Sequence, residues 1–272
     1  MAEFPLVSVL MTVRDAQKTV GLAIESILSQ TLSDFEFLII DDASTDQTWP
    51  ILESYQLKDK RISIFRNESR LGISANRNKL VSLAKADFIA WQDADDISFI
   101  NRLEKQLNFL KSKPAVGICG GWLLFFNEDK NLGLRQYPAN DKILRKRIFR
   151  YSPAAQPAAM LRKEAVVKAG GFKENLVAAE DLDLSFRIGE NYEFANLAEP
   201  ILRYRQSKNS ITFKKLRDLE INTIKIRLNN RKNSAYQFSL IDFLYNFFQA
   251  VTIFIFSAKI RISLFNFFRN NH

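Results

Sequence analysis

The sequence predicts an α/β fold in which a mostly parallel sheet is covered by helices on both faces. Four short segments are apolar on both faces, which is typical of strands in a parallel sheet covered on both sides. These segments span residues 6–11, 35–40, 61–65 and 87–91. Amphipathic helical patterns alternate with them, at 20–28 and around 51–55. This alternation of strand and helix is typical of a doubly wound, Rossmann-like sheet.

Length and composition predict one main domain with a C-terminal extension. The chain has 272 residues, 47% of them hydrophobic, and single cores usually stop growing at roughly 250–300 residues. It is basic from residue 208 to 232 and rich in aromatic residues from 239 to 268. We therefore expect a main α/β domain over residues 1–210 and a basic, aromatic, helical extension over residues 211–272.

The net charge and the scarcity of cysteine and histidine limit the ligands and catalytic groups that this protein can use. The formal net charge is +9, which favours anionic partners such as phosphates, nucleic acid or an acidic membrane leaflet. Cys119 is the only cysteine and His272, the last residue, is the only histidine. Acid–base and metal chemistry must then use carboxylates, which favour Mg²⁺ or Mn²⁺ over zinc. The N-terminus lacks the pattern of a signal peptide, so we expect the protein in the cytoplasm.

The strongest candidate site is the acidic loop after the fourth predicted strand. Ligands of doubly wound sheets bind beyond the carboxyl ends of the strands, and the sequence there is Asp93-Ala94-Asp95-Asp96. Neighbouring carboxylates raise one another's pKa unless a cation neutralises them. The alternative is an acidic turn that caps a helix beginning near Ser98.

Three other segments are weaker candidates. After the second strand, Asp41 and Asp42 could accept hydrogen bonds from a base or ribose, although Ser44, Thr45 and Asp46 could simply cap a helix. In the segment 70–78, Gly72 and a capping Ser74 predict the start of a helix, whose free amides could bind an anion with help from Arg70 or Arg77. The alternative is an ordinary helix start at which these arginines are simply solvated. Acids at 180, 181 and 183 open another helix, which is electrostatically favourable without any function.

These motifs, in this order, resemble those of the family 2 glycosyltransferases of GT-A fold. The matching segments are 7–11 (VSVLM), 39–46 (IIDDASTD), 71–78 (LGISANRN), 93–96 (DADD), 101–106 (NRLEKQ), 170–172 (GGF) and 180–181 (ED). An ordered series is far more specific than any single motif. The resemblance implies an inverting enzyme that transfers a sugar from a nucleotide diphosphate sugar, usually a UDP-sugar, to a hydroxyl group.

The resemblance also implies roles for individual residues. Asp42 would contact the nucleotide base, Asp93 the ribose, and Asp95, with Asp93 beside it, the Mn²⁺ or Mg²⁺ ion that bridges the diphosphate. Asp181 would be the catalytic base. The nucleotide-sugar site would further include Thr12, Arg14, Gly72, Arg77 and Ala94.

Two segments depart from the family pattern. After the first strand the sequence is Thr12-Val13-Arg14-Asp15, so the tyrosine that relatives stack on the base is missing, and Arg14 could stack in its place. Where relatives carry a histidine near the end of the domain, this chain has Ser207, and Lys208 could substitute as a point charge.

The acceptor and the tail stay open. The basic character of the chain suggests an enzyme of surface polysaccharide or lipid-linked glycan synthesis. Two alternative functions are an inactive GT-A scaffold and a nucleic-acid-binding protein. The second is disfavoured because the aromatic residues lie in apolar segments and not among the basic clusters. Residues 243–258 carry no charge but are too few to span a bilayer. That segment, with the polar stripe Asp242, Asn246, Gln249, Thr252 and Ser257, suits a helix on the inner face of the cytoplasmic membrane. Otherwise its aromatic face packs on the main domain or on a second subunit.

Overall fold

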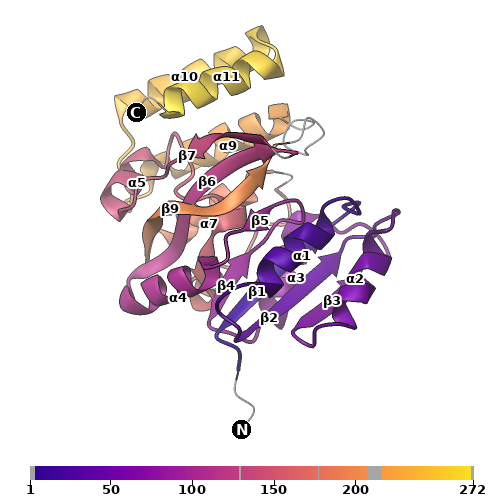
Figure 1. Cartoon of the computed structure of the whole chain (residues 1–272). Coiled ribbons are helices and arrows are strands. Elements are labelled where there is room, and N and C mark those ends of the chain that lie inside the picture. The colour runs from indigo at the N-terminus through magenta and orange to yellow at the C-terminus, as the bar shows by residue number, and fades with distance from the viewer. Residues whose placement is uncertain (1–3, 129, 177, 207–215, 271–272) are drawn as a thin grey trace.

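The computed structural model describes residues 4–128, 130–176, 178–206 and 216–270, with side chains up to residue 265. Its strands form one curved, nine-stranded sheet flanked by helices, and the C-terminal helices lie at the end of the molecule opposite the N-terminus (Figure 1). The predicted α/β class with a C-terminal helical segment is therefore confirmed.

The sheet has the order β3-β2-β1-β4-β8-β6-β9-β5, with β7 paired to β6. Its strands are β1 (Val7–Val13), β2 (Phe35–Asp41), β3 (Ile62–Arg66), β4 (Phe88–Trp91), β5 (Ile97–Ser98), β6 (Val116–Asn127), β7 (Lys130–Arg135), β8 (Met160–Arg162) and β9 (Glu193–Arg205). The first four are mutually parallel, as are β6 and β9, whereas β8 runs antiparallel to both β4 and β6. The carboxyl ends of β1, β2 and β4 thus meet at one edge, where the candidate loops follow.

Helices cover both faces of the sheet. They are α1 (Val20–Leu28), α2 (Thr48–Gln56), α3 (Ile73–Leu83), α4 (Arg102–Ser112), α5 (Asp141–Arg147), α6 (Lys163–Lys168), α7 (Glu180–Ile188), α9 (Leu216–Asn229), α10 (Leu240–Ile255) and α11 (Ala258–Asn270), with short 3₁₀ turns at Gln156–Ala158 and Asn230–Lys232. Side chains of α1, α2 and α4 share one core with Val9 and Met11 of β1, while those of α3, α5, α6 and α7 share the other with Leu10. Successive side chains of β1 therefore point to opposite faces of the sheet and pack into two different cores.

The four predicted strands are confirmed to within two residues, but three local predictions need correction. The helix expected near Ser98 begins at Arg102, because residues 97–98 form β5 and pair with β9. Ser74 does not cap α3: Gly72 holds the N-cap position with a φ of 91°, and Ser74 lies inside the helix. Asp46 accepts a hydrogen bond from the amide of Thr48 at 2.9 Å, so it supports the start of α2 although Gln47 holds the N-cap position.

Helix α9 packs against α7 and α10, and α10 bonds to Phe149 and Arg150 in the segment that follows α5. The predicted polar stripe exists, but it faces inward: Asp242, Asn246 and Thr252 of α10 are buried. Phe243, Phe247, Phe248 and Phe254 of α10 are exposed, whereas Tyr245 is half-buried and packs edge-on against Tyr151. The aromatic side chains of α10 thus divide between the surface and a contact with the main domain. Among the described residues, none of the helices combines the length and apolar character that crossing a bilayer requires. The division at residue 210 stays a prediction.

Candidate active site

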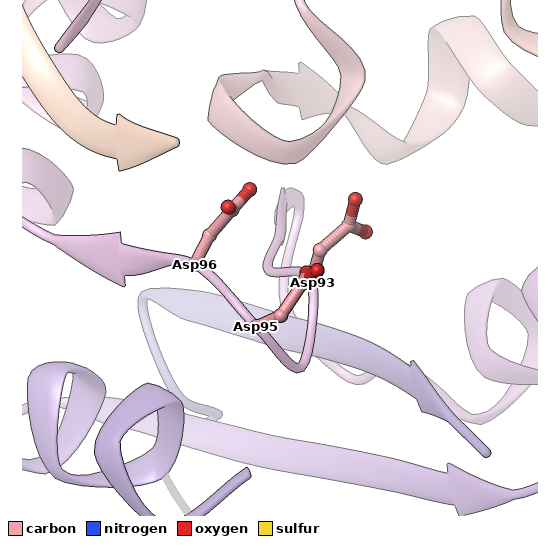
Figure 2. A group of neighbouring side chains, drawn as sticks. All are labelled: Asp93, Asp95 and Asp96. Carbon is pink, nitrogen blue, oxygen red and sulfur yellow. The ribbon is translucent and has the colours of Figure 1, made fainter. Parts of the chain in front are cut away.

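The acidic loop joins β4 to β5 at the carboxyl edge of the sheet. Carboxylate oxygens of Asp93, Asp95 and Asp96 lie within 4.8 Å of one another, and the three side chains leave one tight turn (Figure 2). Asp93 and Asp95 are half-buried and Asp96 is buried, whereas Ala94 packs into the core beside them. The three carboxylates therefore gather as the sequence predicted, whereas their binding of a metal stays a prediction.

Residues distant in the sequence hold this loop in place. Arg205, the last residue of β9, donates its amide to Asp96 Oδ1 and its Nε to the carbonyl of Asp95, both at 2.8 Å. Arg102, fully buried at the start of α4, donates to the carbonyl of Trp91 at 2.7 Å and to the side chain of Gln92. The turn is thus fixed from both sides before any ligand binds.

Burial and mutual repulsion make the loop an electrostatically costly place for three negative charges. Burial raises the pKa of Asp93 to about 6, with repulsion from Asp95 and Glu180 adding to the shift. Burial likewise raises the pKa of Asp95, and it raises that of Asp96 well above its ordinary range, helped by the charges of Asp93 and Asp95. Within the described chain, Asp96 Oδ2 is buried without a hydrogen-bond partner. A cation would relieve all three.

Arg77 of α3 lies beneath the acidic loop, ion-paired to Glu180 at the start of α7. The Nη1–Oε1 distance is 2.5 Å, and both side chains are largely buried. The guanidinium also stacks over the rings of Trp91 and Phe172, at 5.3 and 5.4 Å from their centroids. Its Nη1 is engaged in this buried pair, which suits a positioning role. The predicted contact between Arg77 and the nucleotide sugar stays a prediction.

Asp181 lies next to this ion pair, in the first turn of α7. The helix follows Ala179, whose φ of 62° turns the chain into it. Burial raises the pKa of Asp181 to about 6, with the negative charge of Glu180 adding to the shift and the positive charge of Arg77 opposing it. Because Arg77 and Glu180 also act on Asp93, the α7 terminus and the acidic loop share one electrostatic environment.

Asp42, at the end of β2, organises the segment before α3. Its carboxylate accepts hydrogen bonds from the amides of Leu71 at 2.8 Å and Gly72 at 3.1 Å, and from the side chain of Asn67 at 3.0 Å. Burial alone would raise its pKa, but the side chain of Asn76 together with these bonds outweighs it and lowers the pKa below the ordinary value. Asp42 and Gly72, predicted separately, are thus in direct contact.

The loops after β1 and β2 are bonded to each other. Ser44 accepts a hydrogen bond from the amide of Asp15 at 2.9 Å and also bonds to Asp41, and the Asp15 carboxylate accepts the amide of Thr45 at 2.8 Å. Thr12 is half-buried in β1, and Arg14 is exposed, 3.3 Å from the Asp15 carboxylate. The guanidinium of Arg14 is therefore accessible at the sheet edge.

Sequence reasoning missed the partners that support the site. Arg102, Glu180 and Arg205 were not predicted to have a role in it, although Arg102 and Glu180 stand within the motifs quoted above. Arg205 and Glu180 contact residues 110 and 103 positions away, which no local pattern reveals. Ser207 and Lys208 lie outside the described residues.

The fold and the site define a class of protein. A parallel α/β sheet carries at its carboxyl edge a carboxylate cluster suited to a hard cation, a buried aspartate organising a glycine-initiated helix, and a separate acid whose pKa lies near neutrality. This arrangement is that of a glycosyltransferase of GT-A fold.

Comparison of sequences identifies the family. The sequence profile described as glycosyl transferase family 2 matches residues 8–170. An uncharacterized glycosyltransferase of Methanocaldococcus jannaschii is 31% identical over 257 residues, which cover 93% of this chain and 88% of that protein. The Escherichia coli enzyme UDP-Glc:alpha-D-GlcNAc-diphosphoundecaprenol beta-1,3-glucosyltransferase WfgD is 29% identical over 218 residues, or 79% of this chain and 83% of that enzyme. The chain belongs to glycosyl transferase family 2 and is a glycosyltransferase.

Solved structures agree on the fold. The S. aureus TarS 1-349 complex with UDP superposes with a TM-score of 0.66 at 19% identity, covering 95% of this chain and 74% of that one. The mannosyltransferase PcManGT from Pyrobaculum calidifontis, in complex with GDP-Man and Mn²⁺, gives a TM-score of 0.65 at 15% identity, covering 93% and 70%. At these identities the likeness concerns the fold alone.

Proposed function

We propose that this glycosyltransferase is a metal-dependent, inverting enzyme that transfers a sugar from a nucleotide diphosphate sugar, a UDP-sugar first of all, to a hydroxyl group of a glycan acceptor. The observation that carries the proposal is the cluster of Asp93, Asp95 and Asp96 at the carboxyl end of β4. Three carboxylates held this closely repel one another, and a bound cation would balance their charge.

The residues fit Mn²⁺ or Mg²⁺. All three donors are carboxylate oxygens, the hard ligands that these ions prefer, and Asp96 Oδ2 is buried without a partner among the described residues. Asp95 and Asp93 would hold the ion, with Asp96 as the third acid. A bound cation would neutralise the charge that develops on the departing diphosphate. Arg205 and Arg102 keep the loop in position for it.

Asp181 is the proposed catalytic base. The acceptor oxygen forms a bond to the anomeric carbon while the bond from that carbon to the diphosphate breaks, and the hydroxyl proton passes to the Asp181 carboxylate. A single displacement of this kind inverts the configuration. A pKa of about 6 suits the role, because such a carboxylate is ionised at neutral pH yet is a stronger base than an exposed aspartate.

The loops of β1 and β2 would bind the nucleotide. We propose that Asp42 and Gly72 form the base pocket together with Thr12, and that Arg14 stacks on the base through its planar guanidinium. Because the Ala94 side chain packs into the core, its backbone would lie beside the ribose and diphosphate, between Asp93 and Asp95. UDP as the nucleotide is supported by TarS, which was solved with UDP.

For the acceptor, we propose a surface polysaccharide or a lipid-linked glycan. WfgD, similar over 79% of this chain, is named for a diphosphoundecaprenol-linked acceptor. An acceptor of that kind would place the reaction at the inner face of the cytoplasmic membrane, in keeping with the predicted location.

The test is turnover of a panel of sugar nucleotides, read as released nucleotide, with Mn²⁺ and after chelation. We expect Asp95→Asn to abolish metal-dependent turnover, and Asp59→Asn, before β3 at the opposite edge of the sheet, to leave it unchanged. Asp181→Asn should lower turnover by a factor on the order of 10² to 10⁴, whereas Asp218→Asn, also in the first turn of a helix, should not. Full activity in chelator would refute the metal role.

The two rival readings have distinct outcomes. If the protein is an inactive scaffold, no donor should be turned over. The carboxylates that the proposed reaction requires are nevertheless present, and Arg77 and Glu180 influence the pKa of both Asp93 and Asp181. A nucleic-acid binder predicts salt-dependent binding to DNA or RNA. Family membership argues against both.

A further inference from the structure

Helix α10 is amphipathic, and its polar side faces the protein interior. Asp242 is 1% exposed and forms an ion pair with Arg150 at 2.8 Å. Asn246 donates a hydrogen bond to the carbonyl of Phe149 at 2.9 Å, and Arg227 of α9 donates to Gln249 at 3.0 Å. A capping box between Ser239 and Asp242 fixes the start of the helix. These specific bonds set the rotation of α10 about its axis.

The opposite side of α10 is an exposed apolar surface, which we call the α10 face. It comprises Leu240, Ile241, Phe243, Leu244, Phe247, Phe248, Val251, Phe254 and Ile255. Leu240 and Phe254, near the two ends of the helix, are 72% and 74% exposed, so the surface runs along the whole element. Contiguous apolar surfaces of this kind mark sites of interaction, because leaving them in water is unfavourable.

Basic residues lie beside the C-terminal end of the α10 face. The guanidinium of Arg217, exposed on α9, lies 5.6 Å from the ring centroid of Phe254. Lys259, in the first turn of α11, is exposed as well. Within α10 and α11 the only acidic residue is Asp242, and its charge is buried and paired. Arg261 ties α11 to Glu220 of α9 at 2.9 Å, which keeps the basic residues beside the apolar surface.

We propose that the α10 face docks the protein onto the surface of an anionic lipid bilayer. The phenylalanine and leucine side chains would enter the acyl boundary, and Arg217 and Lys259 would contact anionic headgroups. A lipid surface fits better than a second copy of the chain, because anionic headgroups match Arg217 and Lys259, whereas α10 and α11 offer these residues no exposed acidic partner from a second copy. The helix would lie in the plane of the membrane. This inference is independent of the proposed reaction.

The test is flotation of the full-length protein with vesicles of phosphatidylcholine alone or mixed with phosphatidylglycerol, at low and high salt. We expect binding to the mixed vesicles that weakens as salt rises, because charge contributes to it. The Phe247→Ser/Phe254→Ser double variant should bind about tenfold or more weakly. The matched control, Leu22→Ser/Leu57→Ser, removes two exposed leucines from α1 and the end of α2 and should bind as the native protein does.

A charge variant separates the two contributions. Arg217→Glu/Lys259→Glu leaves the apolar side chains intact, and we expect it to lose the preference for anionic vesicles while keeping any binding to neutral ones. Circular dichroism and thermal unfolding of each variant exclude misfolding. Equal flotation of the native protein and the double phenylalanine variant would overturn the proposal. So would a native dimer in sedimentation velocity that the phenylalanine variant loses, together with no vesicle binding, since the occupant would then be a second copy.

Discussion

Replacing Asp93 with asparagine should stabilise the metal-free protein while it abolishes metal-dependent turnover. Burial raises the pKa of Asp93 from the ordinary 3.8 to about 6. The folded state therefore holds this proton more tightly than the unfolded chain. The associated stability is present below about pH 4 and is lost as pH rises through 6, so at pH 7.5 the whole cost is felt.

The size of the effect follows from the shift. At 1.36 kcal/mol per pKa unit, a difference of about two units is worth about 3 kcal/mol. Because Asp93 is only half-buried, solvent screens part of this, and we expect Asp93→Asn to raise the free energy of unfolding by about 1–3 kcal/mol. In thermal unfolding this corresponds to about 2–4 °C for each kcal/mol.

The assay is thermal unfolding at pH 7.5, in chelator and in Mn²⁺. Asp183→Asn is the matched control: this buried acid is paired with Lys173 at 2.8 Å and Arg187 at 2.6 Å, so the same substitution should destabilise the protein by on the order of 1–3 kcal/mol. Native protein should gain stability from Mn²⁺, and Asp93→Asn should not. If Asp93→Asn melts lower than native protein in chelator, or is stabilised by Mn²⁺ equally well, the account of the acidic loop is wrong.

Three further predictions concern the residues around the loop. Because Asp181 must be ionised to accept a proton and has a pKa of about 6, kcat/KM at saturating Mn²⁺ should be about tenfold lower at pH 5 than at pH 7.5; a flat profile would remove Asp181 from the base role. Arg77→Lys should lower kcat by about tenfold or more and destabilise the fold by about 1–3 kcal/mol, since lysine keeps the charge but loses the planar stacking on Trp91 and Phe172; native kcat with lysine at this position would contradict the positioning role. Gly72→Ala should cost about 1–2 kcal/mol from its φ of 91° alone, because the added Cβ meets no atom within 4 Å; urea unfolding measures this, and a neutral result would show that the loop relaxes freely.

Local chemistry carried most of the fold prediction. The first four strands could be located because strands buried on both faces are apolar throughout, and Val7–Val13 and Phe35–Asp41 are nearly continuous buried segments. The second half was less predictable. Strand β8 has three residues and β5 two, and both are stabilised by pairing with distant strands. Residues 97–98 therefore form a strand where local acids and a serine suggested a helix start.

The acids of the site were predictable, whereas their partners were not. Asp93, Asp95 and Asp181 stand in recognisable motifs at the ends of regular elements. Burial raises the pKa of all three acids, and the pairing of Arg77 with Glu180 and the two bonds from Arg205 to the loop modify that effect. Those contacts depend on how β9 and α7 return to the same edge of the sheet. A sequence pattern can place a carboxylate at a strand end, but it cannot state which guanidinium lies beneath it.

The orientation of helix α10 could not be predicted from the sequence either. The spacing of Asp242, Asn246 and Thr252 predicts a helix with one polar side, and in water the apolar side would ordinarily turn inward. Here Arg150, the carbonyl of Phe149 and Arg227 supply partners for a polar side, so burying it leaves few polar groups unsatisfied, and the apolar side remains at the surface. The orientation of the helix is thus decided by the polar groups that the main domain offers, and those groups belong to other elements of the chain.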